Sequence, residues 1–216
     1  MKSGISVAEA QQIVLDACHV LGCETVASVD AQGRVLAAPV VSGRTLPPAD
    51  CSAMDGYAVR AEDLAGASES APVELSVVFE VAAGGQGERP LVAGEAARIF
   101  TGAPIPPGAD SVVIQEDTSA RGDRVEVQVA PQPGENIREA GEDVGRGDVV
   151  PEPGTLLGPA QLGMPASLGR SVVQVHQRPR VAILSGGDEL VDPDGDVAGG
   201  RIVSSNTYAL AALCRA

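Results

Sequence analysis

Four short segments of the chain place carboxylate or hydroxyl groups beside glycine, the combination in this sequence best suited to chemistry. Glycine lets backbone amides approach an anion closely. Carboxylate and hydroxyl oxygens suit Mg²⁺ that shares its ligand shell with phosphate. Taken singly, each segment is more typical of an ordinary turn. The segments are DCSAMDGY at 50–57, FTGAPIP at 100–106, GENIREAGED at 134–143 and SGGDEL at 185–190.

The composition argues against several classes of protein. The chain has 216 residues, of which 44% are apolar but only 2% aromatic, so we expect a core of aliphatic side chains. A formal net charge of −14 argues against a nucleic-acid partner, because phosphate backbones attract positive surfaces. No apolar run reaches the roughly 20 residues of a membrane span, so no membrane partner is expected. The four cysteines lack paired spacing and indicate reduced thiols in a cytoplasmic protein.

The N-terminal part of the chain carries a helix-start signal, since Ser6 and Glu9 have the spacing of a capping box. Apolar residues then recur at three- and four-residue steps, which predicts a helix over 7–21 that Gly22 ends. After it we expect a strand over 24–29, a turn and short helix over 30–38, and an extended crossing segment over 39–48.

Residues 47–146 have the pattern of a β-rich domain. Short β-like runs alternate with turns that contain glycine or proline, and several short strands at this spacing favour a small barrel or sandwich. The runs lie at 73–77, 96–100, 111–115 and 125–129.

The last part of the chain changes character. After a helix expected over 159–168 and a strand over 171–176, the nearly continuous apolar run RVAIL at 180–184 is typical of a strand buried on both faces of a parallel sheet. A strand-like stretch at 201–203 and a helix start at Ser205 follow. A parallel sheet needs several strand–helix–strand units. We therefore expect a chain that is truncated within this domain.

Four long stretches occur in the order and spacing of the MoeA/gephyrin family, the molybdopterin molybdenumtransferases. They are DCSAMDGYAVR, RIFTGAPIPPGADSVVIQED, GENIREAGEDV and VAILSGGDEL, and SSNTYAL resembles the helix start that follows them in that family. The resemblance covers nearly the whole chain and identifies it as the N-terminal half of such a protein.

The resemblance implies an α+β multidomain fold. A discontinuous N-terminal, dimerisation domain at 1–46 and 147–178 would carry an inserted, β-rich, barrel-like domain at 47–146. Residues 179–216 would form the first strand and helix of a truncated α/β molybdopterin-binding domain.

The resemblance also implies an activity in molybdenum cofactor biosynthesis. The family inserts molybdenum from molybdate into adenylylated molybdopterin and releases AMP, with a divalent cation that is usually Mg²⁺. It further implies a homodimer with a cleft shared between subunits, and a molybdopterin-adenylylating enzyme as functional partner. We expect the isolated chain to be inactive.

By motif position, the resemblance gives catalytic roles to Asp55, Thr101, Asp143 and Glu189. The three carboxylates are also the expected metal ligands, and Thr101 would act as a hydroxyl donor or ligand. The residues expected to bind the molybdopterin substrate or cofactor are Ser52, Gly102, Arg138, Ser185, Gly187 and Asp188.

Five residues raise further questions. Cys51 stands where the family usually has Asn, and Gly186 replaces a usual Thr, so each removes a polar side chain from a candidate loop. The sequence does not assign a role to either. Binding anionic substrates also needs local positive charge, for which Arg98, Arg138 and Arg180 are the nearest candidates.

Two other functions stay open at the level of sequence. One is a non-catalytic dimerisation or scaffold module of the same family. The other is a carbohydrate- or nucleotide-binding β-domain unrelated to molybdenum.

Overall fold

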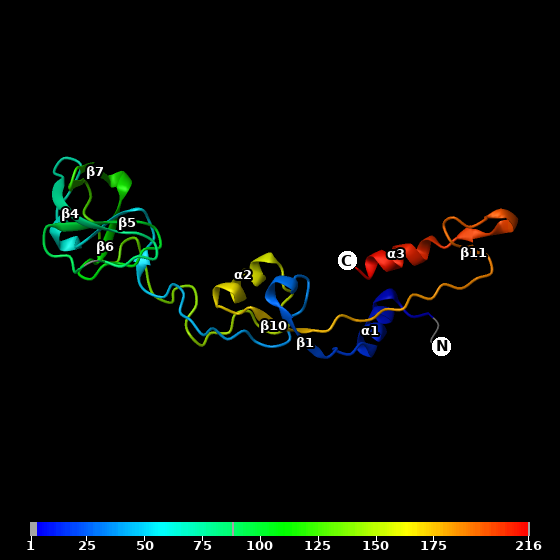
Figure 1. The fold of residues 1–216 in the computed structure, drawn as a ribbon. Helices are drawn as coiled ribbons and strands as arrows, with labels where there is room; N and C mark the ends of the chain where they lie inside the picture. Colours follow the sequence, from blue (N-terminus) through cyan, green and yellow to red (C-terminus); the bar gives the residue numbers. More distant parts are fainter. Residues whose placement is uncertain (1–3, 88, 216) are drawn as a thin grey trace. The chain divides into compact units, whose positions relative to one another are not determined.

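The computed structural model describes residues 4–87 and 89–215 of the chain (Figure 1). It has the mixed α+β composition expected from the sequence. The chain forms two compact units, one of residues 27–173 and one that combines 1–26 with 174–216. The finer division into domains at 1–46 with 147–178, 47–146 and 179–216 stays a prediction.

A curled, six-stranded sheet that forms a half-barrel is the centre of the unit 27–173 (Figure 1). Strands β4 and β5 run parallel, and all other neighbours in this sheet are antiparallel. Each of the four β-like runs in the sequence forms a strand here, so the predicted β-rich region is confirmed. The order across the sheet is β6 (Ser111–Ile114), β3 (Gly56–Val59), β5 (Glu95–Ile99), β4 (Val73–Val81), β8 (Arg124–Val127) and β7 (Thr118–Arg121).

The core of this sheet is aliphatic, as the composition predicted. Two clusters of buried side chains fill it, and Tyr57 and Phe79 are their aromatic members. The fully buried side chains include Leu64, Leu75, Val59, Val81, Ile99, Val112, Val113, Val125 and Val127.

Shorter elements complete this unit. The helix predicted at 159–168 is present as α2, which begins with proline at its first position, where a missing N–H costs nothing. The extended crossing segment is also present, because bridges join Val41 to Val149 and Leu46 to Val144. The elements are η1 (Ser28–Asp30), β2 (Cys51–Ser52), η2 (Ala61–Leu64), η3 (Gln115–Asp117), β9 (Ile137–Arg138) and α2 (Pro159–Ser167).

The second unit contains the two ends of the described chain. Helix α1 (Val7–Ala17) starts with the predicted capping box, in which Ser6 and Glu9 exchange hydrogen bonds. Strand β1 (Cys23–Ala27) pairs with β10 (Val172–His176). Strands β11 (Leu190–Val191) and β12 (Ile202–Val203) pair in parallel, and η4 (Ala198–Gly200) and α3 (Ser205–Leu213) complete the unit. No helix in the described part of the chain is long and apolar enough to cross a membrane.

The prediction of a strand over 180–184 is wrong. These residues have no regular secondary structure, and Val181 and Leu184 are 58% and 95% exposed. A strand exists only where neighbouring strands satisfy its backbone groups. Among the described residues none pairs with this run, so its apolar side chains stay uncovered.

Two helix predictions also need correction. The first helix ends at Ala17 rather than 21, because Cys18 is extended and its N–H donates to the Leu15 carbonyl at 3.0 Å, which tightens and closes the last turn. The short helix predicted within 30–38 is absent. Leu36 N–H instead donates to the Thr155 carbonyl at 2.9 Å, so this stretch pairs with a distant segment.

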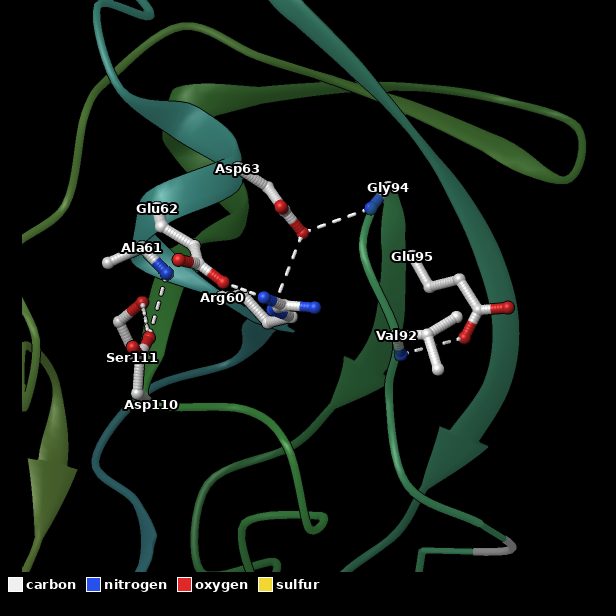
Figure 2. A network of polar contacts seen from close by, with 9 residues as sticks. All are labelled: Arg60, Ala61, Glu62, Asp63, Val92, Gly94, Glu95, Asp110 and Ser111. Carbon is white, nitrogen blue, oxygen red and sulfur yellow. Dashed lines mark hydrogen bonds and ion pairs between the residues drawn. The ribbon is translucent and has the colours of Figure 1, made fainter.

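A network of polar contacts ties η2 to the turns that precede β5 and β6 (Figure 2). Asp63 Oδ2 accepts the Gly94 N–H at 3.0 Å and lies 3.9 Å from Arg60 Nε, while Asp110 Oδ1 accepts the Ala61 N–H at 2.7 Å. Arg60 also pairs with Glu62. These contacts fix the starts of two strands that flank β3.

Gly56 is the first residue of β3, and the sheet leaves no room for a side chain at this position. A Cβ at this position would lie 2.0 Å from the Val113 carbonyl oxygen and 2.9 Å from its carbon. Since both contacts are to backbone, the sheet itself would have to move.

We therefore predict that Gly56→Ala destabilises the protein by about 1–3 kcal/mol, the usual cost of forcing an extra methyl into a packed site. Gly163→Ala in α2 is the matched control, because a Cβ there meets nothing within 4 Å. The control should stabilise the protein by roughly 0.5–1 kcal/mol. Urea unfolding measures both changes, and an equal response of the two variants would contradict the steric argument.

Candidate functional site

Three of the four glycine-containing segments lie together in the unit 27–173. The first segment hydrogen-bonds to the second, since Ser52 N–H donates to the Ala103 carbonyl at 2.9 Å and Gly102 N–H donates to the Ser52 carbonyl at 2.8 Å. The first segment also pairs with the third through β2 and β9. The fourth segment, at 185–190, belongs to the other unit.

Asp55 and Thr101 meet where the first two segments touch. Asp55 Oδ1 accepts the Thr101 backbone N–H at 2.8 Å and the Thr101 hydroxyl at 2.7 Å. These hydrogen bonds, together with the nearby Arg98 charge, lower the pKa of Asp55 below its ordinary value of 3.8 against a smaller opposing effect of desolvation. Asp55 is therefore a carboxylate at neutral pH. Its Oδ2 accepts no hydrogen bond from the residues that the structure describes.

The same contact determines what Thr101 offers to a ligand. Its hydroxyl hydrogen is donated to Asp55, so Oγ1 has only its lone pairs left to offer. In this arrangement Thr101 is an oxygen acceptor, which favours its predicted role as a ligand over its predicted role as a hydroxyl donor. Gly102 follows with φ +80°, a value that favours glycine, and turns the chain back toward Ser52.

Arg138 and Asp143 form an ion pair in the third segment. Arg138 Nη2 donates to Asp143 Oδ1 at 2.5 Å, and Arg138 Nε donates to a Glu142 oxygen at 3.3 Å. Asp143, and then Glu142, raise the pKa of the Arg138 guanidinium. An open pocket of about 430 Å³ lies beside this pair, lined by Ile137, Glu139, Ala140, Gly141 and Glu142. The positive charge of Arg138 is thus already partly balanced by its own segment.

Cys51 is buried, with 7% of its surface exposed, and lies opposite Arg138 in the β2–β9 pair. The thiol therefore belongs to the packing of the loop. No His, Cys, Asp or Glu side chains in the described residues join it in a group able to hold a metal ion. Nothing in the structure explains why cysteine replaces the usual Asn.

The fourth segment, at 185–190, lies in space beside the first turn of α3. Ser185 and Gly187 line a pocket of about 430 Å³ that Ser204 and Thr207 also line. Ser185 Oγ lies 2.9 Å from Ser204 Oγ, which lies 2.7 Å from Thr207 Oγ1. A row of three hydroxyl groups therefore joins this loop to the first turn of the helix.

The acidic residues of the fourth segment are arranged differently from Asp55. The Glu189 carboxylate turns back over Gly187, since a Cβ on Gly187 would lie 2.5 Å from both of its oxygens. Asp188 is exposed. A Cβ on Gly186 would meet nothing within 4 Å, so no packing constraint requires glycine in place of the usual Thr.

The proposed metal ligands Asp55, Asp143 and Glu189 are not assembled into a metal site. No three carboxylate, imidazole or thiol groups come together in a suitable geometry in the part of the chain that the structure describes. Asp55 and Asp143 belong to the unit 27–173 and Glu189 to the other unit, so this three-residue set stays a prediction.

Sequence reasoning missed several residues at these loops. Ser204 and Thr207 complete the hydroxyl row, and the signal for them was the stretch SSNT, which was interpreted only as a helix start. Asp50 accepts the Ala140 N–H at 2.8 Å and so ties the first segment to the third. Arg180 is exposed, and no hydrogen bond or ion pair in the described residues involves it.

Comparisons with known proteins agree on one family. A family model described as the MoeA N-terminal region (domain I and II) matches residues 5–169. A molybdopterin molybdenumtransferase from Nostoc sp. is 46% identical over 185 residues, which are 86% of this chain and 42% of that protein. Molybdopterin molybdenumtransferase 2 from Mycobacterium tuberculosis is 42% identical over 210 residues, or 97% of this chain and 52% of that protein.

The fold has a counterpart among solved structures. A crystal structure of the molybdopterin biosynthesis moeA protein from Pyrococcus horikoshii OT3 superposes with a TM-score of 0.88 at 39% identity, covering 96% of this chain and 56% of that one. The chain thus spans about half the length of the proteins that it matches.

We predict that Asp55→Asn removes a pH-dependent part of the folding stability. Because the folded-state pKa of Asp55 is lowered, its ionised form stabilises the protein fully above pH 3.8, and that contribution disappears as the pH falls through the lowered value. The variant should therefore be less stable than the parent at about pH 6, and the difference should shrink as the pH falls below 3.8 through the lowered pKa.

Thermal unfolding across this pH range measures the difference. Glu69→Gln is the control, because Glu69 is exposed and accepts no hydrogen bond among the described residues. A stability gap between Asp55→Asn and the parent that persists unchanged at the acid end would contradict the assignment.

Proposed function

This chain belongs to the MoeA family, and we propose that it supplies the N-terminal part of a molybdopterin molybdenumtransferase. In this role it takes part in molybdenum cofactor biosynthesis. The reaction transfers molybdenum from molybdate to the dithiolene of adenylylated molybdopterin and releases AMP. The observation that supports this proposal is the packing of three family segments against one another, with Asp55 and Thr101 joining the first two and the β2–β9 pair joining the first to the third.

In the proposal, Asp55 acts by charge and position and not by proton transfer. A carboxylate with a lowered pKa is a weak base at neutral pH, so it is poorly matched to general base catalysis. It is well matched to holding Thr101 in one orientation while its second oxygen faces a ligand. Thr101 Oγ1 adds a second oxygen beside it.

These two oxygens fit a divalent cation that is shared with phosphate. Magnesium commonly takes one or two protein ligands and completes its shell with water and substrate phosphates. We propose that Asp55 Oδ2 and Thr101 Oγ1 hold it, without a requirement for a second carboxylate from this unit. When bound, the cation would neutralise charge on the phosphate oxygens that separate as AMP leaves.

We further propose a cytoplasmic homodimer with a shared cleft, supplied with substrate by a molybdopterin-adenylylating enzyme. The exposure of apolar side chains on α1 supports an additional protein surface: Val7, Ile13 and Val14 are 87%, 51% and 63% exposed, and α1 contains no buried residue. The same observation favours the second candidate function, a non-catalytic dimerisation module.

We predict that the isolated chain forms no active cofactor, whereas a chimera with the remaining part of the Nostoc relative does. The assay supplies molybdate and adenylylated molybdopterin and measures activation of a cofactor-free molybdoenzyme. Asp55→Ala in the chimera should lower the rate by at least about 10- to 100-fold, the loss that removal of even an outer partner of a metal ligand causes.

Glu69→Ala is the matched control in the chimera and should retain the parent rate. An inactive parent chimera that folds and dimerises would favour the non-catalytic module. A fully active Asp55→Ala chimera would overturn the role of Asp55.

A further inference from the structure

Arg98 lies close to two aromatic rings. Its guanidinium carbon lies 5.1 Å from the ring centre of Tyr57 and 4.9 Å from that of Phe100. Tyr57 is the partner of Arg98 across the β3–β5 pair, and Phe100 follows two residues later in the same chain direction. Both separations are within the range of cation–π attraction. One ring therefore comes from β3 and the other from the residue that follows β5.

The edges of the same guanidinium are used by hydrogen bonds. Arg98 Nη1 donates to the Gly56 carbonyl at 3.0 Å, and Nη2 donates to Gln115 Oε1 at 2.8 Å. Gln115 in turn donates its backbone N–H to the Asp55 carbonyl at 3.1 Å. Arg98 is thus connected to the backbone carbonyls of both Asp55 and Gly56, one of them through Gln115.

These contacts converge on the Asp55–Thr101 pair from both of its sides. On one side Arg98 fixes the backbone that carries Asp55. On the other, Arg98 lies three residues before Thr101, and Phe100, whose ring lies near the guanidinium, directly precedes Thr101. The side-chain contact between Asp55 and Thr101 needs both backbones in register.

We propose that Arg98 is the positioning residue of the Asp55–Thr101 pair. This inference rests on the proposed function for its consequence in the reaction, but not for its geometry. It replaces the expectation that Arg98 offers positive charge directly to an anionic substrate. A guanidinium that lies near two rings and donates to two acceptors is already engaged by the protein.

The guanidinium group suits this place, because it keeps a delocalised charge near the two rings while it donates hydrogen bonds in two directions. Lysine would keep the charge beside Asp55 and lose this geometry. Arg98→Lys and Arg98→Met therefore separate charge from position, since the first removes only the planar fork and the second removes both.

The test uses the 216-residue chain and needs no substrate. Hydrogen exchange of the Thr101 amide reports whether its bond to Asp55 persists, and the amide proton chemical shift reports a charged acceptor. Both variants should speed exchange of this amide about tenfold relative to the parent, the equivalent of one lost cation–π contact with its hydrogen bonds. The proton shift should move upfield in both.

Arg124→Met is the matched control, because Arg124 is an arginine of the same sheet that pairs with Glu74 and touches neither Asp55 nor Thr101. It should leave the Thr101 amide unchanged. The proposal would be overturned if the Thr101 amide of Arg98→Met had the exchange rate and proton shift of the parent. Parent values in Arg98→Lys would show that charge alone is sufficient, which would overturn the requirement for the guanidinium geometry.

Gln115→Ala keeps the proposal testable if Arg98→Met does not fold. It removes one acceptor of the guanidinium while leaving the rings, so Thr101 exchange should rise by a smaller factor. An unchanged Thr101 amide in this variant would also overturn the proposal.

In the active chimera, a positioning role and a substrate-binding role have different kinetic signatures. Loss of position should lower kcat with KM nearly unchanged, whereas loss of a substrate contact should raise KM. A selective rise in KM would overturn the proposal. An inactive parent chimera with the expected Thr101 exchange data would count against the proposed function and leave the positioning role supported.

Discussion

The close approach of Gly56 to the Val113 carbonyl sets how the chain leaves the sheet at Asp55. Strand β3 is hydrogen-bonded on both sides, with Gly56 opposite Ile99 in β5 and opposite Ile114 in β6. All four of its residues are buried. Because β3 has no freedom to shift between these neighbours, the residue before it emerges in a fixed direction. The carboxylate of Asp55 then meets the turn that follows β5, and the first two candidate segments come together.

The arginines nearest the three packed segments, Arg138 and Arg98, are already engaged by groups of the protein. Arg138 is paired with Asp143 and Glu142, and Arg98 lies near two rings and donates to the Gly56 carbonyl and to Gln115 Oε1. An anionic ligand at this place would therefore meet backbone amides and a cation carried with it more readily than a free arginine. This agrees with a chain whose formal net charge is −14 and whose candidate loops are rich in carboxylates.

Local patterns predicted local structure well, and failed where the outcome depended on distant residues. The capping box at Ser6 and the short strands between glycine and proline turns follow from nearby residues alone. The run at 180–184 has the composition of a buried strand, but burial requires partner strands that no single segment specifies. The meeting of three candidate segments was expected only from the family resemblance. The contacts of Arg98 could not be predicted from the sequence, because its two rings and two acceptors come from three separate stretches of chain.

The bridges between the crossing segments have a consequence for the cost of lengthening the stretch that carries the sheet. Leu46 and Val144 are bridge partners, so the stretch between them begins and ends at one place within the unit 27–173. When the two ends of an inserted stretch are adjacent, doubling its length adds only about 0.6 kcal/mol of closure entropy. Loops that join the strands of the half-barrel can therefore lengthen at a small entropic cost.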